Sequence, residues 1–344
     1  MKKWQLFQAT DFQSLMYPCF IFCRILGIFP YKMNASIFKL SKSRCVVSIV
    51  ITCMICYMQF MFLHWLIHGR KYISDLPLAL HGNCYYLFSG FITIVTHVLT
   101  SPRMRLLQTI MDISSTLPSK TYKKLSKLIH TKDIFSFFSF FVIITICYYK
   151  LKFDLKLYLY TIYISLVVFQ MDMLYMNCVC ILKACFKRIN DNLANLREPV
   201  MVDMPHIFSR IYQQGNPFLL MELKALEKQY LMISNTVQML NLIFSLQLLS
   251  SITLTICEVT FNLYFYITQW CISTLRIDDE DLIGKMRKDF WFWYFLICII
   301  YQFLKTASII WACETGKNQA LEIGTTVHIV FNSINDENVK YEVM

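Results

Sequence analysis

Six apolar stretches divide this chain, and they constrain its fold more than any other feature. An α-helix rises 1.5 Å per residue, so about 20 apolar residues cross the ~30 Å hydrocarbon core of a bilayer. The stretches are residues 45–66, 76–100, 134–149, 157–182, 240–267 and 290–313. The third is short but carries no charged residue. They predict an all-α fold, a polytopic transmembrane helical bundle with six spans and the lipid bilayer as a partner.

The composition excludes other classes of protein. Of the 344 residues, 56% are hydrophobic and 16% are charged, against roughly 25% charged in an average soluble domain. A soluble chain of this kind could not cover its surface with polar groups. The net charge is +11, but no basic run interleaved with aromatic residues suggests a nucleic-acid groove. We therefore expect neither a cytosolic enzyme nor a nucleic-acid partner.

The basic residues predict the orientation of the chain. Of the 33 Lys and Arg residues, 23 lie in segments 1–44, 101–133, 183–239 and 314–344. Nine lie in the three loops on the other side, and Lys305 lies within the sixth stretch. Because cytoplasmic loops carry the excess of Lys and Arg, the N-terminus is predicted to be cytoplasmic. We expect a multi-pass protein of the plasma membrane.

Three domains follow from this orientation. Residues 1–44 form a cytoplasmic N-terminal segment, 45–313 the six-span domain with a cytosolic helical loop at 183–239, and 314–344 a cytoplasmic tail. Residues 12–30 are expected to form a helix at the inner interface, or alternatively one packed in the cytosol. The loop 101–133 is expected to be basic and cytoplasmic.

The loop 183–239 is predicted to be helical. Asn216 and Pro217 form a helix start, with Asn as N-cap and Pro in the first turn. An apolar stripe at spacings of three and four then leads into the fifth span. Its members are Leu223, Leu226, Tyr230, Ile233, Val237 and Leu240. Long helices therefore project into the cytosol, where they must pack together.

The motifs of catalysis and metal binding are missing from the sequence. His64 and His68 form a single H-x-x-x-H pair, which interfacial histidines explain as well as a metal site does. Phosphate-binding loops, nucleophile elbows and zinc-protease motifs do not occur. We expect no enzyme activity, no metal and no cofactor. A disulfide among Cys84, Cys147 and Cys271 stays open, since sequence cannot pair them.

Three residues of the Asp, Glu, Lys and Arg types fall inside the predicted spans. Asp172 lies in the inner half of the fourth and Glu258 in the middle or outer half of the fifth. An ionisable group within the membrane is costly and suggests function, although a hydrogen-bonded acid can also fix helix packing. Lys305 is expected at the inner interface, which its long stem can reach.

Aromatic side chains with polar tips crowd the outer halves of the spans. Such residues suit a pocket for a small, partly polar ligand, and they also suit an interfacial aromatic belt. The candidate ligand-binding residues are His81, Tyr85, Tyr86, Tyr148, Tyr160, Tyr163, Glu258, Asn262, Tyr264 and Trp293.

Three stretches of the chain carry a family resemblance. They are Cys23 to Pro30, an R-h-L-G-h-h-P pattern; Met171 to Asn177, which bears an acid; and Ala312-Cys313-Glu314 with the residues that follow. Together with six spans and a cytoplasmic N-terminus, they resemble the insect gustatory receptors. The resemblance implies a seven-span, ligand-gated cation channel assembled as a tetramer. It also implies a ligand pocket in the outer half of the bundle and an inter-subunit anchor of long cytosolic helices.

The resemblance further implies a pore-lining seventh helix with the signature T-Y-x-x-x-x-x-Q-F. The chain stops at Met344 before such a helix. The expectation is a gustatory channel subunit for a sugar or a bitter compound, in a homo- or hetero-tetramer, from a truncated sequence. The alternatives are a non-conducting or modulatory subunit and, less favoured because of the charge distribution, a G-protein-coupled receptor.

Overall fold

The computed structural model describes residues 6–34, 37–68, 76–151, 155–201, 217–275 and 282–333. In this part of the chain, six helices are long and apolar enough to cross a membrane. They are α2 (Lys42–His68), α3 (Leu76–Val98), α5 (Ser119–Leu151), α6 (Leu155–Met201), α8 (Pro217–Leu275) and α9 (Leu282–Ser333). Each predicted apolar stretch lies mainly in a different one of these helices. The predicted all-α polytopic bundle is confirmed.

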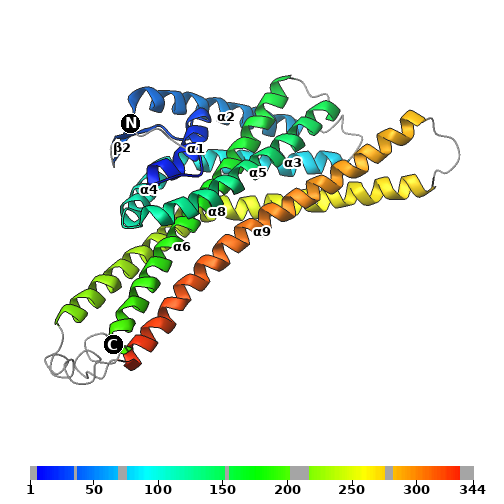
Figure 1. The fold of residues 1–344 in the computed structure, drawn as a ribbon. Coiled ribbons are helices and arrows are strands. Elements are labelled where there is room, and N and C mark those ends of the chain that lie inside the picture. The colour runs from blue at the N-terminus through cyan, green and yellow to red at the C-terminus, as the bar shows by residue number, and fades with distance from the viewer. Residues whose placement is uncertain are drawn as a thin grey trace.

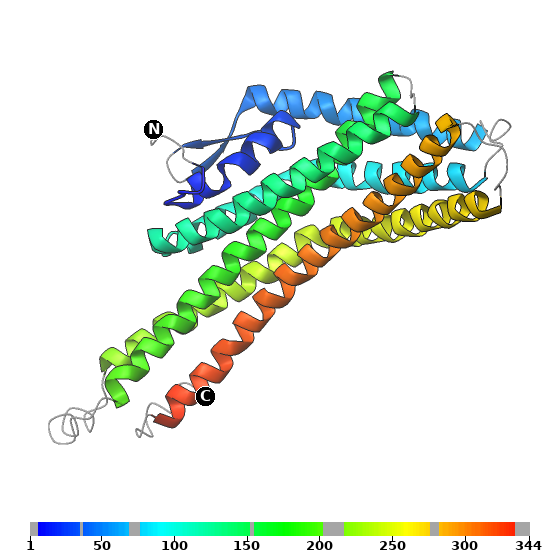
Figure 2. The ribbon, with the colours of Figure 1, turned by 45° about the vertical axis from the view of Figure 1, so that its right-hand side comes forward.

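The helix ends give the bundle two distinct ends (Figure 1). One end of the bundle is here called the distal end. It holds the C-terminal ends of α2, α5 and α8 and the N-terminal ends of α3, α6 and α9 (Figure 2). The opposite, basal end holds the other termini of these helices. The charge distribution predicts that the distal end is extracellular and the basal end cytosolic.

Three helices extend well beyond the thickness of a bilayer. α6, α8 and α9 contain 47, 59 and 52 residues, whereas about 20 suffice to cross the hydrocarbon core. Their basal parts run side by side in both views (Figures 1 and 2). α8 begins at Pro217, as predicted, while Asn216 lies outside the described residues.

The predicted apolar stripe of α8 is buried inside this chain. Leu226, Ile233 and Leu240 are at most 6% exposed and belong to the main hydrophobic core, and the ring of Tyr230 lies 5.9 Å from that of Phe186 in α6. The stripe therefore stabilises α8 against its own chain. It does not by itself provide the inter-subunit anchor that the family resemblance implied.

The N-terminal segment packs onto the bundle. α1 (Phe12–Ile25) begins with a capping box in which the Ser14 backbone N–H donates to Asp11 Oδ1 over 2.8 Å. A hairpin of β1 (Tyr31–Asn34) and β2 (Ile37–Leu40) follows, and Phe20 stacks on Phe29 at 4.9 Å. One face of α1 is buried against the bundle, and both expectations for this helix, at the inner interface or in the cytosol, stay predictions.

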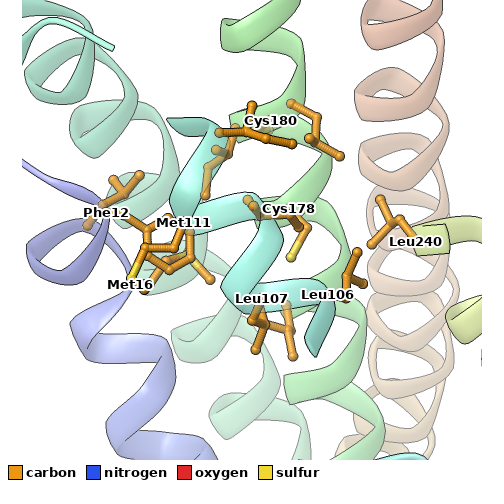
Figure 3. Close-up of a cluster of buried hydrophobic side chains, with 14 of the residues drawn as sticks. Phe12, Met16, Leu106, Leu107, Met111, Cys178, Cys180 and Leu240 are labelled. Carbon is orange, nitrogen blue, oxygen red and sulfur yellow. The ribbon is translucent and has the colours of Figure 1, made fainter. Parts of the chain in front are cut away.

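One helix was not predicted. α4 (Thr100–Ser114) occupies part of the segment expected to be a basic cytoplasmic loop. Figure 3 shows Leu106, Leu107 and Met111 of α4 between side chains of α1, α6 and α8. The apolar residues at helical spacing were the available signal, but the neighbouring basic residues suggested a loop.

A buried arginine explains why the charges of α4 misled the prediction. Arg103 is 4% exposed, donates to the Thr96 carbonyl over 3.0 Å and to Gln247 Oε1 over 3.5 Å, and lies over the Phe244 ring. Burial lowers the pKa of its guanidinium to about 10, so the side chain remains cationic at neutral pH. This basic residue belongs to the core and not to a solvated surface.

Candidate functional site

A hydrogen-bonded acid and imidazole join α3 to α8 in the distal half of the bundle. His81 Nε2 lies 3.0 Å from Glu258 Oε1, and the two side chains are 24% and 13% exposed. Asn262, one turn further along α8, donates to the Glu258 carbonyl over 2.7 Å and approaches Glu258 Oε2 at 3.4 Å. The i, i+4 spacing on a helix places the amide beside the acid. Three of the ten candidate residues thus form one cluster.

Phenylalanine rings surround this cluster. The rings of Phe261 and Phe265 lie 5.3 Å and 6.0 Å from the His81 ring, and Phe265 stacks on Phe295 of α9 at 5.6 Å. An apolar wall makes a carboxylate's hydrogen bonds stronger than they would be in water. The arrangement combines a carboxylate, an imidazole and an amide with aromatic surface, which suits a small, partly polar ligand.

A second group of candidates forms a closed polar cluster between α2, α3 and α6. The Tyr160 hydroxyl donates to Gln59 Oε1 over 2.6 Å, and Gln59 Nε2 donates to the Tyr86 carbonyl over 3.2 Å. Tyr86 bonds through its hydroxyl to Thr161 over 2.8 Å, and Tyr85 bonds to Ser165. These hydroxyl groups already have partners within the protein. The geometry therefore favours helix packing for this group.

The remaining candidates lie elsewhere. The Tyr163 hydroxyl donates to the Leu26 carbonyl over 2.8 Å and so ties α6 to the N-terminal segment. Tyr264 and Trp293 are 48% and 58% exposed, on the outside of this chain. Tyr148 lies in α5, but its side chain is outside the described residues. The ten candidates fall in several places, and the His81–Glu258–Asn262 cluster is the best formed of them.

A second charge pair lies deeper, between α6, α8 and α9. Lys305 Nζ is 3.2 Å from Asp172 Oδ2, and the Ser251 hydroxyl donates to the same oxygen over 2.9 Å. The lysine and aspartate side chains are 8% and 1% exposed. Asp172 Oδ1 has no hydrogen-bond partner among the described residues. Its partner Asp172, 133 positions earlier in the chain, holds Lys305 inside the bundle. The expectation that Lys305 lies near the inner interface stays a prediction.

The other predicted features give no further site. The side chain of His68 is outside the described residues, so the H-x-x-x-H pair stays untested. Within the described ranges, no three His, Cys, Asp or Glu side chains gather as a metal site would require. No disulfide joins Cys84 to Cys271, and the Cys147 side chain is outside the described residues.

Comparison with known families decides the class of this protein. Residues 16–344 match the family model described as 7tm Chemosensory receptor. The chain belongs to the 7tm chemosensory receptor family. No curated protein matches it significantly. The receptor is therefore a multi-pass membrane protein of a non-enzyme class, and the family resemblance drawn from the sequence is confirmed.

Proposed function

We propose that this receptor is a gustatory, ligand-gated cation channel subunit that detects a small-molecule tastant, a sugar or a bitter compound. It resides in the plasma membrane with a cytoplasmic N-terminus and works in a homo- or hetero-tetramer. The observation that carries the proposal is the cluster of His81, Glu258 and Asn262 in the distal half of a chemosensory-family bundle. An ionisable group in a membrane bundle is a functional hypothesis by default.

The cluster can couple binding to a change between helices. His81 is in α3 and Glu258 is in α8, so their bond joins the two helices directly. A ligand hydroxyl or amine that bonds to the carboxylate competes with the imidazole for it. A ligand shifts a conformational equilibrium only through such differential contacts. Release of His81 from Glu258 is the contact change that we assign to activation.

Glu258→Gln tests the assignment directly. Cells that express the receptor are exposed to a panel of sugars and bitter compounds, and cation current and surface expression are recorded. Since loss of a buried charged hydrogen bond costs about 1.5–3 kcal/mol, we expect at least a tenfold rise in the half-maximal concentration of an active tastant. Glu227→Gln is the matched control, because this exposed glutamate lies on the basal part of the same helix. Equal responses of both variants and the wild type would overturn the role of Glu258.

The same experiment separates a conducting from a modulatory subunit. Current from cells that express this chain alone supports a complete channel. Current only after coexpression with another receptor of the family supports a modulatory role. In that case the Glu258→Gln variant shows whether the ligand site belongs to this chain or to its partner.

A further inference from the structure

A cavity of about 370 Å³ lies between α5 and α9, away from the cluster of His81 and Glu258. Of the nine candidate ligand residues whose side chains are described, none lines it. Met173 contributes from α6. The lining of the cavity also includes Lys132, Phe135, Ser136, Phe138, Ser139, Val142 and Ile143 of α5 and Ile297, Ile300, Lys305 and Ser308 of α9.

The polarity of the cavity changes along its length. α5 runs from the basal to the distal end and α9 runs in the opposite direction (Figures 1 and 2). Low residue numbers in α5 therefore face high numbers in α9. The basal part of the lining carries Lys132 and Ser136 opposite Lys305 and Ser308, and the distal part carries isoleucine and valine side chains. The cavity is thus cationic and hydroxyl-bearing at one end and apolar at the other.

Both ammonium groups line the cavity, while their acidic partners do not. Lys132 Nζ lies 2.6 Å from Asp133 Oδ1 and 3.4 Å from the Met173 sulfur. Lys305 Nζ lies 3.2 Å from Asp172 Oδ2 and 3.5 Å from the Ser251 hydroxyl. An ammonium has three N–H donors. Each lysine can therefore donate to an anion in the cavity while it keeps its bond to the carboxylate.

The level of the cavity matches the basal leaflet. Lys132 lies just before the apolar stretch 134–149, where headgroups meet the hydrocarbon core. Four further lysines precede it on the exposed surface of α5, at Lys120, Lys123, Lys124 and Lys127. Such clusters attract anionic lipids of the cytoplasmic leaflet, at about 1 kcal/mol for each basic residue near the surface.

The cavity also opens toward the place where lipid would lie. Phe135 and Phe138 belong to its lining and are 64% and 69% exposed, so no helix of the described chain covers them. An acyl chain that leaves the cavity between these rings enters the bilayer directly. A soluble anion would gain nothing from this apolar part, whereas an amphipathic molecule uses both ends.

We propose that this cavity binds one anionic phospholipid of the basal leaflet. The phosphate lies between Lys132 and Lys305, within reach of the hydroxyl groups of Ser136 and Ser308. An acyl chain follows the apolar lining toward Ile297. The lipid joins α5 to α9, and its site shares no lining residue with the cluster of His81, Glu258 and Asn262.

Native mass spectrometry of the detergent-purified receptor tests this site. The protein is titrated with dioleoylphosphatidylglycerol and with dioleoylphosphatidylcholine, which carries the same acyl chains. We expect one phosphatidylglycerol to be retained at concentrations where phosphatidylcholine is not. Equal retention of both lipids would overturn the anionic site.

Two variants locate the bound lipid. Lys132→Gln should weaken phosphatidylglycerol binding roughly fivefold. Lys127→Gln, the same change on the exposed surface of α5 and outside the cavity, should weaken it less than Lys132→Gln does. Ser139→Trp fills the cavity without changing its charge and should displace the lipid in a folded protein. Equal loss from both lysine variants would show diffuse attraction instead of a site. Undiminished binding by the tryptophan variant would place the lipid elsewhere.

Discussion

The receptor contains two charge pairs within its membrane bundle, and they differ in how completely the protein encloses them. His81 and Glu258 are 24% and 13% exposed and join two helices, α3 and α8. Lys305 and Asp172 are 8% and 1% exposed, and Ser251 brings a third helix into their contact. The first pair joins a carboxylate to an imidazole, whereas the second joins a carboxylate to an ammonium group.

The difference in burial suggests different roles for the two pairs. The partly exposed pair of His81 and Glu258 is a candidate ligand site, and the buried pair of Asp172 and Lys305, here called the clamp, holds helices together. A buried ion pair adds little folding stability compared with apolar side chains of similar volume. Removal of one partner, however, leaves an uncompensated buried charge and is strongly destabilising. A partly exposed pair can exchange a partner for water or ligand at small cost. We therefore expect the pair of Asp172 and Lys305 to hold α6 and α9 together, and the pair of His81 and Glu258 to be adjustable.

The largest effect is expected from Lys305→Ala. This change leaves the Asp172 carboxylate buried with Ser251 as its remaining partner, so the free energy of unfolding should fall by about 3–5 kcal/mol. Thermal unfolding of the purified receptor in detergent measures the loss. Lys317→Ala is the control, because Lys317 pairs with Glu314 at 3.7 Å on the exposed part of the same helix and should cost less than about 1 kcal/mol.

A double variant distinguishes lost charge balance from lost packing. Lys305→Met combined with Asp172→Leu removes both charges at similar volume and should recover most of the stability. If the double variant is as unstable as Lys305→Ala, apolar side chains cannot replace the ion pair, and the charges themselves specify the fold.

A smaller effect is expected from Ser251→Ala, which removes one hydrogen bond from the Asp172 carboxylate. Hydrogen bonds to charged groups contribute about 1.5–3 kcal/mol, so the loss should be smaller than that from Lys305→Ala. Ser245→Ala is the matched control, because this serine of α8 is exposed and bonds to the Leu242 carbonyl. The same thermal assay applies, and equal Tm values for both variants would show that Ser251 does not support the clamp.

The sequence predicted the bundle well and the charge pairs poorly, for physical reasons. The burial of an apolar stretch can be predicted from its own residues. The six membrane helices and the stripe at Leu226 and Ile233 therefore followed from the local sequence pattern. Pairing depends on which helices meet, and Asp172 and Lys305 lie far apart in the chain. Glu258 was found because an acid in an apolar stretch is conspicuous, and His81 was a candidate without a predicted partner. Arg103 was missed because it entered the analysis only as one of the basic residues of a cytoplasmic loop.

The smallest effect on stability is expected from His81→Gln. Glu258 then keeps Asn262 and its partial exposure, so the free energy of unfolding should change by less than about 1 kcal/mol. The response to a tastant should change nonetheless, because the group that competes with the ligand for the carboxylate is altered. Thermal unfolding and dose–response curves of the same variant measure the two effects. A loss as large as that from Lys305→Ala would make the distal pair a second clamp, and Glu258 would lose its support as a ligand contact.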